Sequence, residues 1–230
     1  IESVKNFGLI GIYILEPAEP LPPMSEDDIE FEKFQAVEFF EIMDELKSIA
    51  KTNKHIKIYN VAQTIIKAYG RLEHKINFVQ NLRSADDFIF KHSLNVAILC
   101  AMISHRLNMR PTEQEELVVS AIVHAVGIVS KDERVKPTVM PEDEELAKRM
   151  EYSGIAKIDA VFISTPAIKR AVLQAFRETN AFYNNEDLSQ HRVVEAAKIL
   201  IVADEFDKFT AMNSIGETPR SEIAALKYFM

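Results

Sequence analysis

The sequence has one cysteine, Cys100, so the chain cannot form an internal disulfide. Cys100 lies in the apolar run 96–103 and is expected to pack as a small hydrophobic residue, as in a reducing cytoplasm. Apolar runs of this length fall far short of the roughly 20 residues that cross a bilayer, and no basic signal with a cleavage site is present. We therefore predict a soluble, cytoplasmic segment. Because it begins with Ile1 rather than methionine, it is expected to be a piece of a longer chain.

Clusters of basic residues are also lacking. Lysine and arginine total 27 against 35 acidic residues, which gives a formal net charge of −8. Phosphate backbones and anionic membrane surfaces bind clustered lysine and arginine. This composition argues against nucleic acid or a membrane surface as the main partner.

Glycine is scarce, with six residues in the whole chain. The sequence contains no G-x-x-x-x-G-K-[ST], G-x-G-x-x-G, C-x-x-C or G-x-S-x-G motif. Phosphate-loop, dinucleotide-binding, zinc-ribbon and serine-hydrolase functions therefore lack support.

Apolar residues recur at helical spacing along most of the chain, and 47% of the residues are hydrophobic, enough to bury a substantial core. Residues 7–15 are rich in β-branched and aromatic residues and predict a short strand, which a proline-rich stretch follows. Helices are predicted from about residue 26 and over 56–82, 86–107, 113–126, 142–152, 167–179, 190–212 and 219–229. The predicted fold is all-α: an N-terminal unit over 1–84 with a short strand and two helices, and a helical domain over 85–230.

Capping signals support several of these helix boundaries. Ser25 is a candidate N-cap for the first long helix, and Thr112 with Glu115 reads as a capping box. The pairs Thr165-Pro166 and Thr218-Pro219 each place an N-cap before a proline at the first helical position. No repeat of 20 to 50 residues is present, so a compact bundle is favoured over a solenoid.

Three segments carry a family resemblance, in order along the chain: 86–109, 116–128 and 196–212. They read DDFIFKHSLNVAILCAMISHRLNM, ELVVSAIVHAVGI and AAKILIVADEFDKFTAM. Together they resemble the HD-GYP branch of the HD-domain superfamily, whose active members hydrolyse the bacterial second messenger cyclic di-GMP. The resemblance implies an HD-domain-like helical bundle.

Three metal-bearing positions of that family match this chain. His92 fits the first histidine, His124 fits the histidine of the His-Asp dyad, and Asp204 fits the aspartate of the V-A-D helix. The dyad aspartate itself is Ala125, and the family's lysine is Ile128.

Other positions of the family pattern also differ. Phe88 stands where some members carry a glutamate, and Met150 replaces a histidine if Gly154 matches the glycine of a later motif. The paired histidines are replaced within 175–178, and the GYP segment by 182–187, which keeps no glycine.

The remaining ligands are too few for a two-metal centre. Two close divalent cations need several anionic or imidazole ligands, and one carboxylate with two imidazoles leaves at most one weakly held ion. We therefore expect no complete metal site, no catalytic residue and no cofactor beyond a single weakly bound divalent metal. His92 and His124 are interpreted either as hydrogen-bonded core or cleft histidines or as residual ligands. Asp204 is expected to be buried against one of them.

Two further residues are expected to have only local or surface roles. Asp207, one turn after Asp204, is expected to cap or pair locally. His105, beside an arginine, is expected to be an exposed helix residue.

The first functional hypothesis is a bacterial signalling protein whose HD-GYP-like domain is catalytically inactive and acts through contacts with a protein partner or as a homodimer. The phenylalanine-containing N-terminal helices are candidates for that interface, with a core role as the alternative.

A second hypothesis is a receptor that binds cyclic di-GMP or another nucleotide without cleaving it. Lys169, Arg170 and Arg177 are then candidates for phosphate contacts, with solvent exposure as the alternative. A third is a metal-dependent phosphodiesterase with residual activity.

Overall fold

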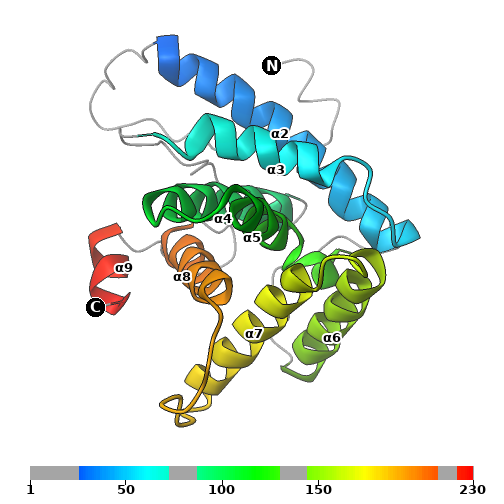
Figure 1. The fold of residues 1–230 in the computed structure, drawn as a ribbon, viewed down its shortest axis with the longest axis vertical. Helices are drawn as coiled ribbons and strands as arrows, with labels where there is room; N and C mark the ends of the chain where they lie inside the picture. Colours follow the sequence, from blue (N-terminus) through cyan, green and yellow to red (C-terminus); the bar gives the residue numbers. More distant parts are fainter. Residues whose placement is uncertain (1–25, 73–86, 130–143, 212–221, 230) are drawn as a thin grey trace, which may run out of the picture.

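The computed structural model describes residues 26–72, 87–129, 144–211 and 222–229 (Figure 1). These ranges are helical and contain no strand. The elements in chain order are α2 (Glu26–Thr52), α3 (Ile58–Tyr69), α4 (Phe88–Arg106), α5 (Pro111–Val123), the 3-10 segment η1 (Val126–Ile128), α6 (Glu144–Val161), α7 (Pro166–Tyr183), α8 (Glu195–Thr210) and α9 (Glu222–Phe229).

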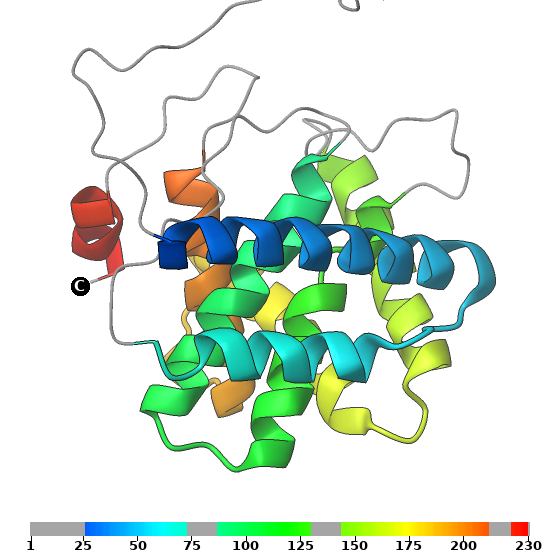
Figure 2. The same ribbon diagram turned by 90° about the horizontal axis from the view of Figure 1, so that it is seen from above.

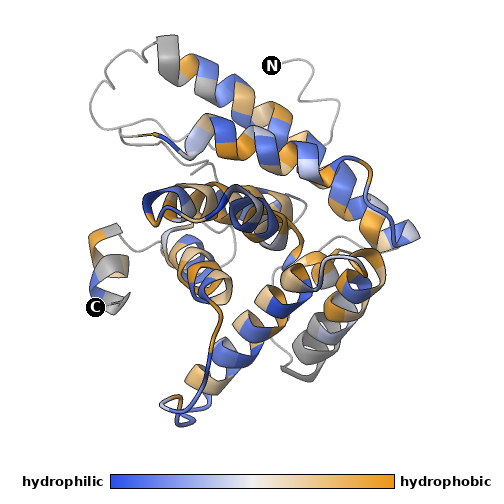
Figure 3. Ribbon diagram, viewed as in Figure 1, coloured by the Kyte–Doolittle hydropathy of each residue, from blue (hydrophilic) through white to orange (hydrophobic). Residues whose placement is uncertain are grey.

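The helices form layers around α4 and α5. Helices α2 and α3 lie side by side across one face of this pair, while α7 and α8 cover the other and α6 packs against α7 and η1 (Figures 1 and 2). Polar and apolar residues alternate along α2, α3 and α7, as expected for amphipathic helices that cover a core (Figure 3). The all-α prediction is confirmed.

Helix α4 lies between other helices of the bundle. By length and composition it could cross a membrane, but most of its residues are buried inside the fold. Because helices pack on both sides of α4, the burial of its apolar residues in the core accounts for its hydrophobic character.

The N-terminal helices share this core. Ile42 and Leu46 of α2 and Ile65 of α3 are fully buried in one cluster with Leu94 and Ile98 of α4. The predicted boundary near residue 84 lies outside the described residues, as does the strand predicted over 7–15. The division into two units stays a prediction.

Helix boundaries agree with the predicted pattern except at a few ends. α3 ends at Tyr69, whereas the sequence predicted a helix over 56–82, of which 73–82 lie outside the described residues. α6 continues to Val161 rather than ending at 152, because the buried Gly154 is accommodated within the helix. A single glycine weakens a helix by about 1 kcal/mol, which packing can offset.

The start of α5 corrects the predicted capping box at Thr112 and Glu115. The helix begins at Pro111, and the Arg110 backbone N–H donates to Glu113 Oε2 at 3.1 Å. Proline is favoured at the first helical position because its φ is already helical, so the helix starts earlier than predicted. Thr165 is the N-cap before a proline in α7, as predicted. Ser25 and 218–219 lie outside the described residues.

Asparagine takes the place of glycine at three helix ends. Asn53, Asn108 and Asn185 have φ of 53°, 53° and 56° and follow α2, α4 and α7. After α4, the Asn108 N–H donates to the His105 carbonyl at 3.0 Å, and the Met109 N–H to the Ser104 carbonyl at 3.1 Å. This pair of bonds is a Schellman motif, which satisfies carbonyls left free at the end of a helix.

Glu38 of α2 provides a test of buried charge. It is 2% exposed, and its Oε2 has no hydrogen-bond partner. Burial, helped by Glu41 and opposed by Lys57, raises its pKa from 4.5 to about 7. A carboxyl with a raised folded-state pKa contributes stability below about pH 4.5 that is lost as the pH rises through about 7.

We therefore expect Glu38→Gln to increase the free energy of unfolding by about 2 kcal/mol at pH 8 and to leave it nearly unchanged near pH 4.5. Urea unfolding followed by circular dichroism at both pH values measures this difference. The matched control is Glu30→Gln at an exposed position of the same helix, which should have no effect. Equal stability of the Glu38 variant and the native chain at pH 8 would contradict the prediction.

Candidate functional site

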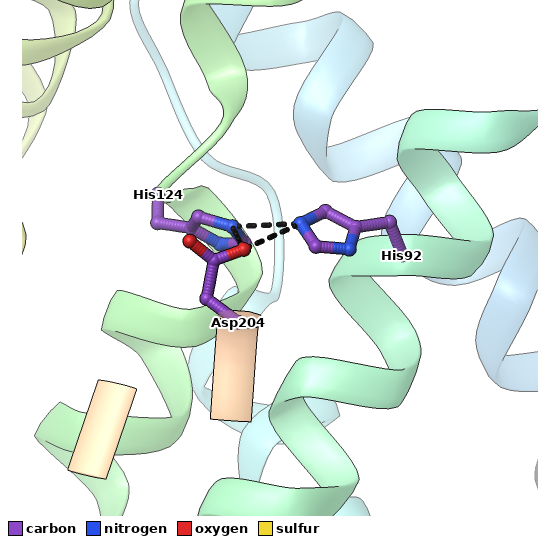
Figure 4. A group of neighbouring side chains, drawn as sticks. All are labelled: His92, His124 and Asp204. Atoms are coloured by element: carbon purple, nitrogen blue, oxygen red, sulfur yellow. Dashed lines mark hydrogen bonds and ion pairs between the residues drawn. The ribbon is translucent and has the colours of Figure 1, made fainter. Parts of the chain in front are cut away.

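The three residues matched to metal-bearing positions meet at one point in the bundle. His92 comes from α4, His124 directly follows α5, and Asp204 comes from α8; their side chains point toward one another (Figure 4). His92 Nε2 lies 3.1 Å from His124 Nε2 and 3.1 Å from Asp204 Oδ1. His124 Nε2 lies 3.6 Å from the same oxygen. The prediction that Asp204 contacts one of these histidines is confirmed for both.

The partners on the far side of each ring determine where the ring protons lie. His124 Nδ1 is 2.6 Å from the Ala121 carbonyl oxygen, which can only accept, so this nitrogen carries a proton. His92 Nδ1 is 2.7 Å from Asp207 Oδ2, again an acceptor when ionised. In each neutral ring the Nε2 atom then carries no proton, and its lone pair is directed at Asp204. Such second partners are typical of metal-ligating histidines.

Three lone pairs that converge need a positive charge between them. Asp204 Oδ1 is buried and forms no hydrogen bond of normal geometry. A proton on His92 Nε2 would relieve the repulsion. Burial lowers the pKa of His92, but its contacts with Asp204 and Asp207 outweigh burial and raise it. A divalent cation at the same point would also place positive charge between these atoms.

The geometry fits one such cation. Metal bonds of about 2.0–2.2 Å at angles near 90–110° place the ligand atoms roughly 3.0–3.5 Å apart. The three observed separations of 3.1, 3.1 and 3.6 Å are close to these values. Two imidazoles and one carboxylate suit iron, zinc or manganese in preference to calcium. Within the described ranges, this is the group of side chains whose ligand atoms lie close enough for a shared ion.

A second ion has no comparable ligand set here. Asp204 Oδ2, the oxygen that would bridge to it, accepts from Lys208 Nζ at 2.7 Å. Burial alone would raise the pKa of Asp204, but Lys208 and the two histidines bring it well below its usual range. Ala125, beside His124, offers no ligand atom, and the Phe88 ring stacks on His92 with centroids 5.9 Å apart.

Asp207 has a larger role than the sequence predicted. It does not simply cap or pair within its own helix: its Oδ2 contacts His92, and its Oδ1 accepts from Asn95 Nδ2 at 2.9 Å. Sequence reasoning also missed Asn95 and Lys208. The available signal was spacing, because Asp204 and Asp207 are three residues apart and share a helix face, as do Asp204 and Lys208.

A pocket of about 190 Å³ opens beside the cluster, between α7 and α8. Its polar wall contains His124, Asp204 and Lys208, and Tyr183 also lines it. Tyr183 donates its hydroxyl to Glu205 Oε2 at 2.6 Å, and Lys208 also reaches Glu205 Oε1, at 3.3 Å. The remaining lining comes from Val172, Ala175, Phe176, Thr179, Asn180 and Leu200.

The predicted phosphate contacts on α7 lie away from this pocket wall. Lys169 forms an ion pair with Asp159 at 2.5 Å, and Arg170 and Arg177 are exposed. None of the three is among the residues that line the pocket. Their role in ligand binding stays a prediction.

A contact between two glycines supports the segment that follows His124. A Cβ added to Gly154 of α6 would lie 3.0 Å from the backbone nitrogen of Gly127 and 3.1 Å from its Cα. Both neighbours are backbone atoms, so they cannot rotate away. Gly154 therefore allows α6 to pack closely on η1.

We expect Gly154→Ala to destabilise the fold by about 1–3 kcal/mol, because forced overpacking outweighs the gain in helix propensity. Thermal and urea unfolding measure the change. Ser153→Ala, at the exposed neighbouring position, is the control and should be neutral or slightly stabilising. A stabilised Gly154 variant would show that α6 can move off η1 without cost.

Comparisons with known proteins identify one similar protein. No family model matches the chain, and no solved structure matches it. The chain is 25% identical over 141 residues to "Ribonuclease Y" of Clostridium novyi (strain NT), covering 52% of this chain and 26% of that protein. This chain thus resembles an HD-domain protein. It spans about a quarter of the length of that relative.

Proposed function

We propose that this chain is a bacterial signalling protein whose HD-GYP-like domain is catalytically inactive and acts through protein–protein contacts. One observation carries the proposal: the described ligand cluster consists of His92, His124 and Asp204, and the residue after His124, where the HD-GYP pattern has an aspartate, is Ala125. The similarity to an HD-domain protein and the helical bundle support the assignment to this superfamily.

Electrostatics explain why the cluster is a poor two-metal centre. Metal pairs that hydrolyse phosphodiesters share a bridging ligand and generate a hydroxide between the two ions. Here the outer oxygen of Asp204 is already bound to the Lys208 ammonium, so a second cation at that oxygen would be repelled. A single ion lacks a partner with which to activate water in that way.

The test of inactivity is a turnover assay with cyclic di-GMP and manganese or iron(II), in which the native chain and His124→Ala are compared. We expect both to give the same background rate, because no two-metal centre forms. Turnover in the native chain that disappears in His124→Ala would refute the proposal and favour the third hypothesis, a phosphodiesterase with residual activity.

A contact surface for the proposed partner is available on α2. Val37 and Phe40 are 56% and 58% exposed and lie on one helix face. Phe39, by contrast, packs against the core. The exposed pair supports an interface with a second copy of the chain or with another protein.

Sedimentation velocity over a range of concentrations, together with affinity capture, tests this role. We expect association that weakens in Val37→Ser/Phe40→Ser and is unchanged in Phe182→Ser, an exposed phenylalanine on α7. A chain that stays monomeric and captures no partner would contradict the contact role.

The pocket beside the cluster supports a second candidate function, that of a receptor which binds cyclic di-GMP or another nucleotide without cleaving it. Its wall contains the Lys208 ammonium, which can contact a phosphate, beside the Asp204 carboxylate to which Lys208 is bonded. The pocket volume of about 190 Å³ is below the roughly 300–1,000 Å³ typical of ligand pockets. The pocket can therefore enclose only part of a nucleotide, such as one base or one phosphate. Calorimetry across a nucleotide panel tests this function, and absence of heat for every nucleotide would remove it.

A further inference from the structure

A second pocket, of about 340 Å³, lies where the end of α3 meets α4 and the start of α5. It is lined by Ile66, Lys67, Arg71, His105 and Gln114, three of which have basic side chains. None of these lining residues is acidic. On a chain with a net charge of −8, this composition marks a local site for an anion.

The basic side chains of the pocket are available to a ligand. Across the described ranges, Lys67, Arg71 and His105 take part in no ion pair. Two acidic residues near the start of α5 have partners: Glu113 pairs with Arg110 at 2.6 Å, and Glu115 accepts from the Gln63 amide at 2.7 Å. The charge of Glu113 is thus partly compensated before a ligand arrives, while Glu115 keeps its charge because the amide is neutral.

The backbone around the pocket also removes an obstacle to an anion. The end of a helix carries partial negative charge on free carbonyls, which would repel phosphate. At the end of α4 the Schellman bonds from Asn108 and Met109 occupy the carbonyls of His105 and Ser104. The Arg106 guanidinium donates to the Leu72 carbonyl just after α3, at 3.1 Å.

Two features fix the shape of the pocket. Gly70 has no side chain, and a Cβ at that position would lie 3.7 Å from His105 Cβ, so the end of α3 comes close to α4. The Gln114 amide nitrogen donates to the Met109 carbonyl at 2.8 Å, which holds this side chain at the pocket wall. Donors from three helices thus surround one space.

We propose that this pocket binds the phosphoryl group of a small soluble ligand. Lys67 and Arg71 supply charge from the end of α3, His105 supplies a ring N–H from α4, and Gln114 supplies a neutral polar contact. A phosphate carries up to two negative charges and accepts hydrogen bonds from several directions, which matches donors on different helices. His105 follows His92 by thirteen residues on α4, about 20 Å along the axis, so the pocket is separate from the histidine cluster.

The experiment is isothermal titration calorimetry of the full chain with pyrophosphate at low salt, with succinate as a carboxylate comparison. We expect binding of pyrophosphate that is stronger than that of succinate. It should weaken about ten-fold in Lys67→Gln and in Arg71→Gln, the loss expected for one charge-assisted hydrogen bond. Arg192→Gln removes an exposed arginine that lies between α7 and α8, outside the lining of this pocket, and should leave the affinity unchanged.

Four outcomes would overturn the proposal. They are no heat with pyrophosphate up to about 10 mM, equal affinity for succinate, an equal loss in Arg192→Gln, and binding only to phosphatidate-containing vesicles in a sedimentation assay. Lys67 and Arg71 are exposed, so their variants should stay folded, which circular dichroism verifies. His124→Ala should bind pyrophosphate normally, so this result is independent of the proposed function of the histidine cluster.

Discussion

Asp207→Ala should lower the free energy of unfolding by about 3–5 kcal/mol, the range measured when one partner of a buried charged pair is removed. Asp207 is 4% exposed and accepts from both His92 Nδ1 and Asn95 Nδ2. Without it, the His92 ring loses the carboxylate that fixes its orientation, and the Asn95 amide is left without this acceptor. Buried polar groups without partners are among the largest causes of destabilisation by single substitutions. Urea unfolding followed by circular dichroism measures the loss.

Two variants control for the removal of negative charge alone. Asp159→Ala breaks a surface ion pair with Lys169, and the expected cost is at most about 1 kcal/mol. Asp207→Asn keeps the shape and one carbonyl acceptor, so it should be less harmful than alanine. If Asp207→Ala were no more harmful than Asp159→Ala, the contact between Asp207 and His92 would not contribute to the folded state.

Binding of divalent cations is expected to stop at one ion per chain. The described ligand atoms come from His92, His124 and Asp204, and Lys208 occupies the outer carboxylate oxygen. His124→Ala removes one of three ligands. Loss of a residue that only orients a ligand typically weakens metal binding about 10- to 100-fold, so loss of a ligand itself should weaken it by about 100-fold or more. Calorimetry with manganese and zinc, with elemental analysis after anaerobic purification, gives affinity and stoichiometry.

His191→Ala is the matched control for metal binding. His191 is a partly exposed histidine that pairs with Glu178 at 2.7 Å, and its loss should not alter the affinity. Asp207→Asn should weaken binding about 10- to 100-fold, because it alters the partner that orients His92. Two ions per chain, or equal binding by the native chain and His124→Ala, would show that the ligand set inferred from the geometry is wrong.

Much of the helical pattern could be predicted because it depends on local sequence. Apolar spacing predicted the described helices, and the order of three motifs selected His92, His124 and Asp204 from segments far apart in the chain. Prediction was weakest at helix ends. The start of α5 at Pro111 and the left-handed asparagines such as Asn108 depend on a few backbone angles that several sequences can adopt.

The cluster illustrates what local pattern cannot supply. Asp207 was expected to act within its helix, yet its partners His92 and Asn95 lie on α4, more than 110 positions earlier. Glu38 has the type and spacing of an ordinary surface residue but is buried. Such properties depend on which helices pack together, and one sequence does not specify that packing through short-range preferences.

Residue chemistry and periodicity were enough to predict that this chain is helical, and the motif pattern was enough to single out His92, His124 and Asp204 and to note Ala125 beside His124. These conclusions follow from residue chemistry and periodicity, which are local. Two contacts could be learned from the folded chain alone: Lys208 binds the outer oxygen of Asp204, and Lys67, Arg71 and His105 line one pocket. Charges act through distance, and distances between residues on different helices are set by the packing of the whole bundle.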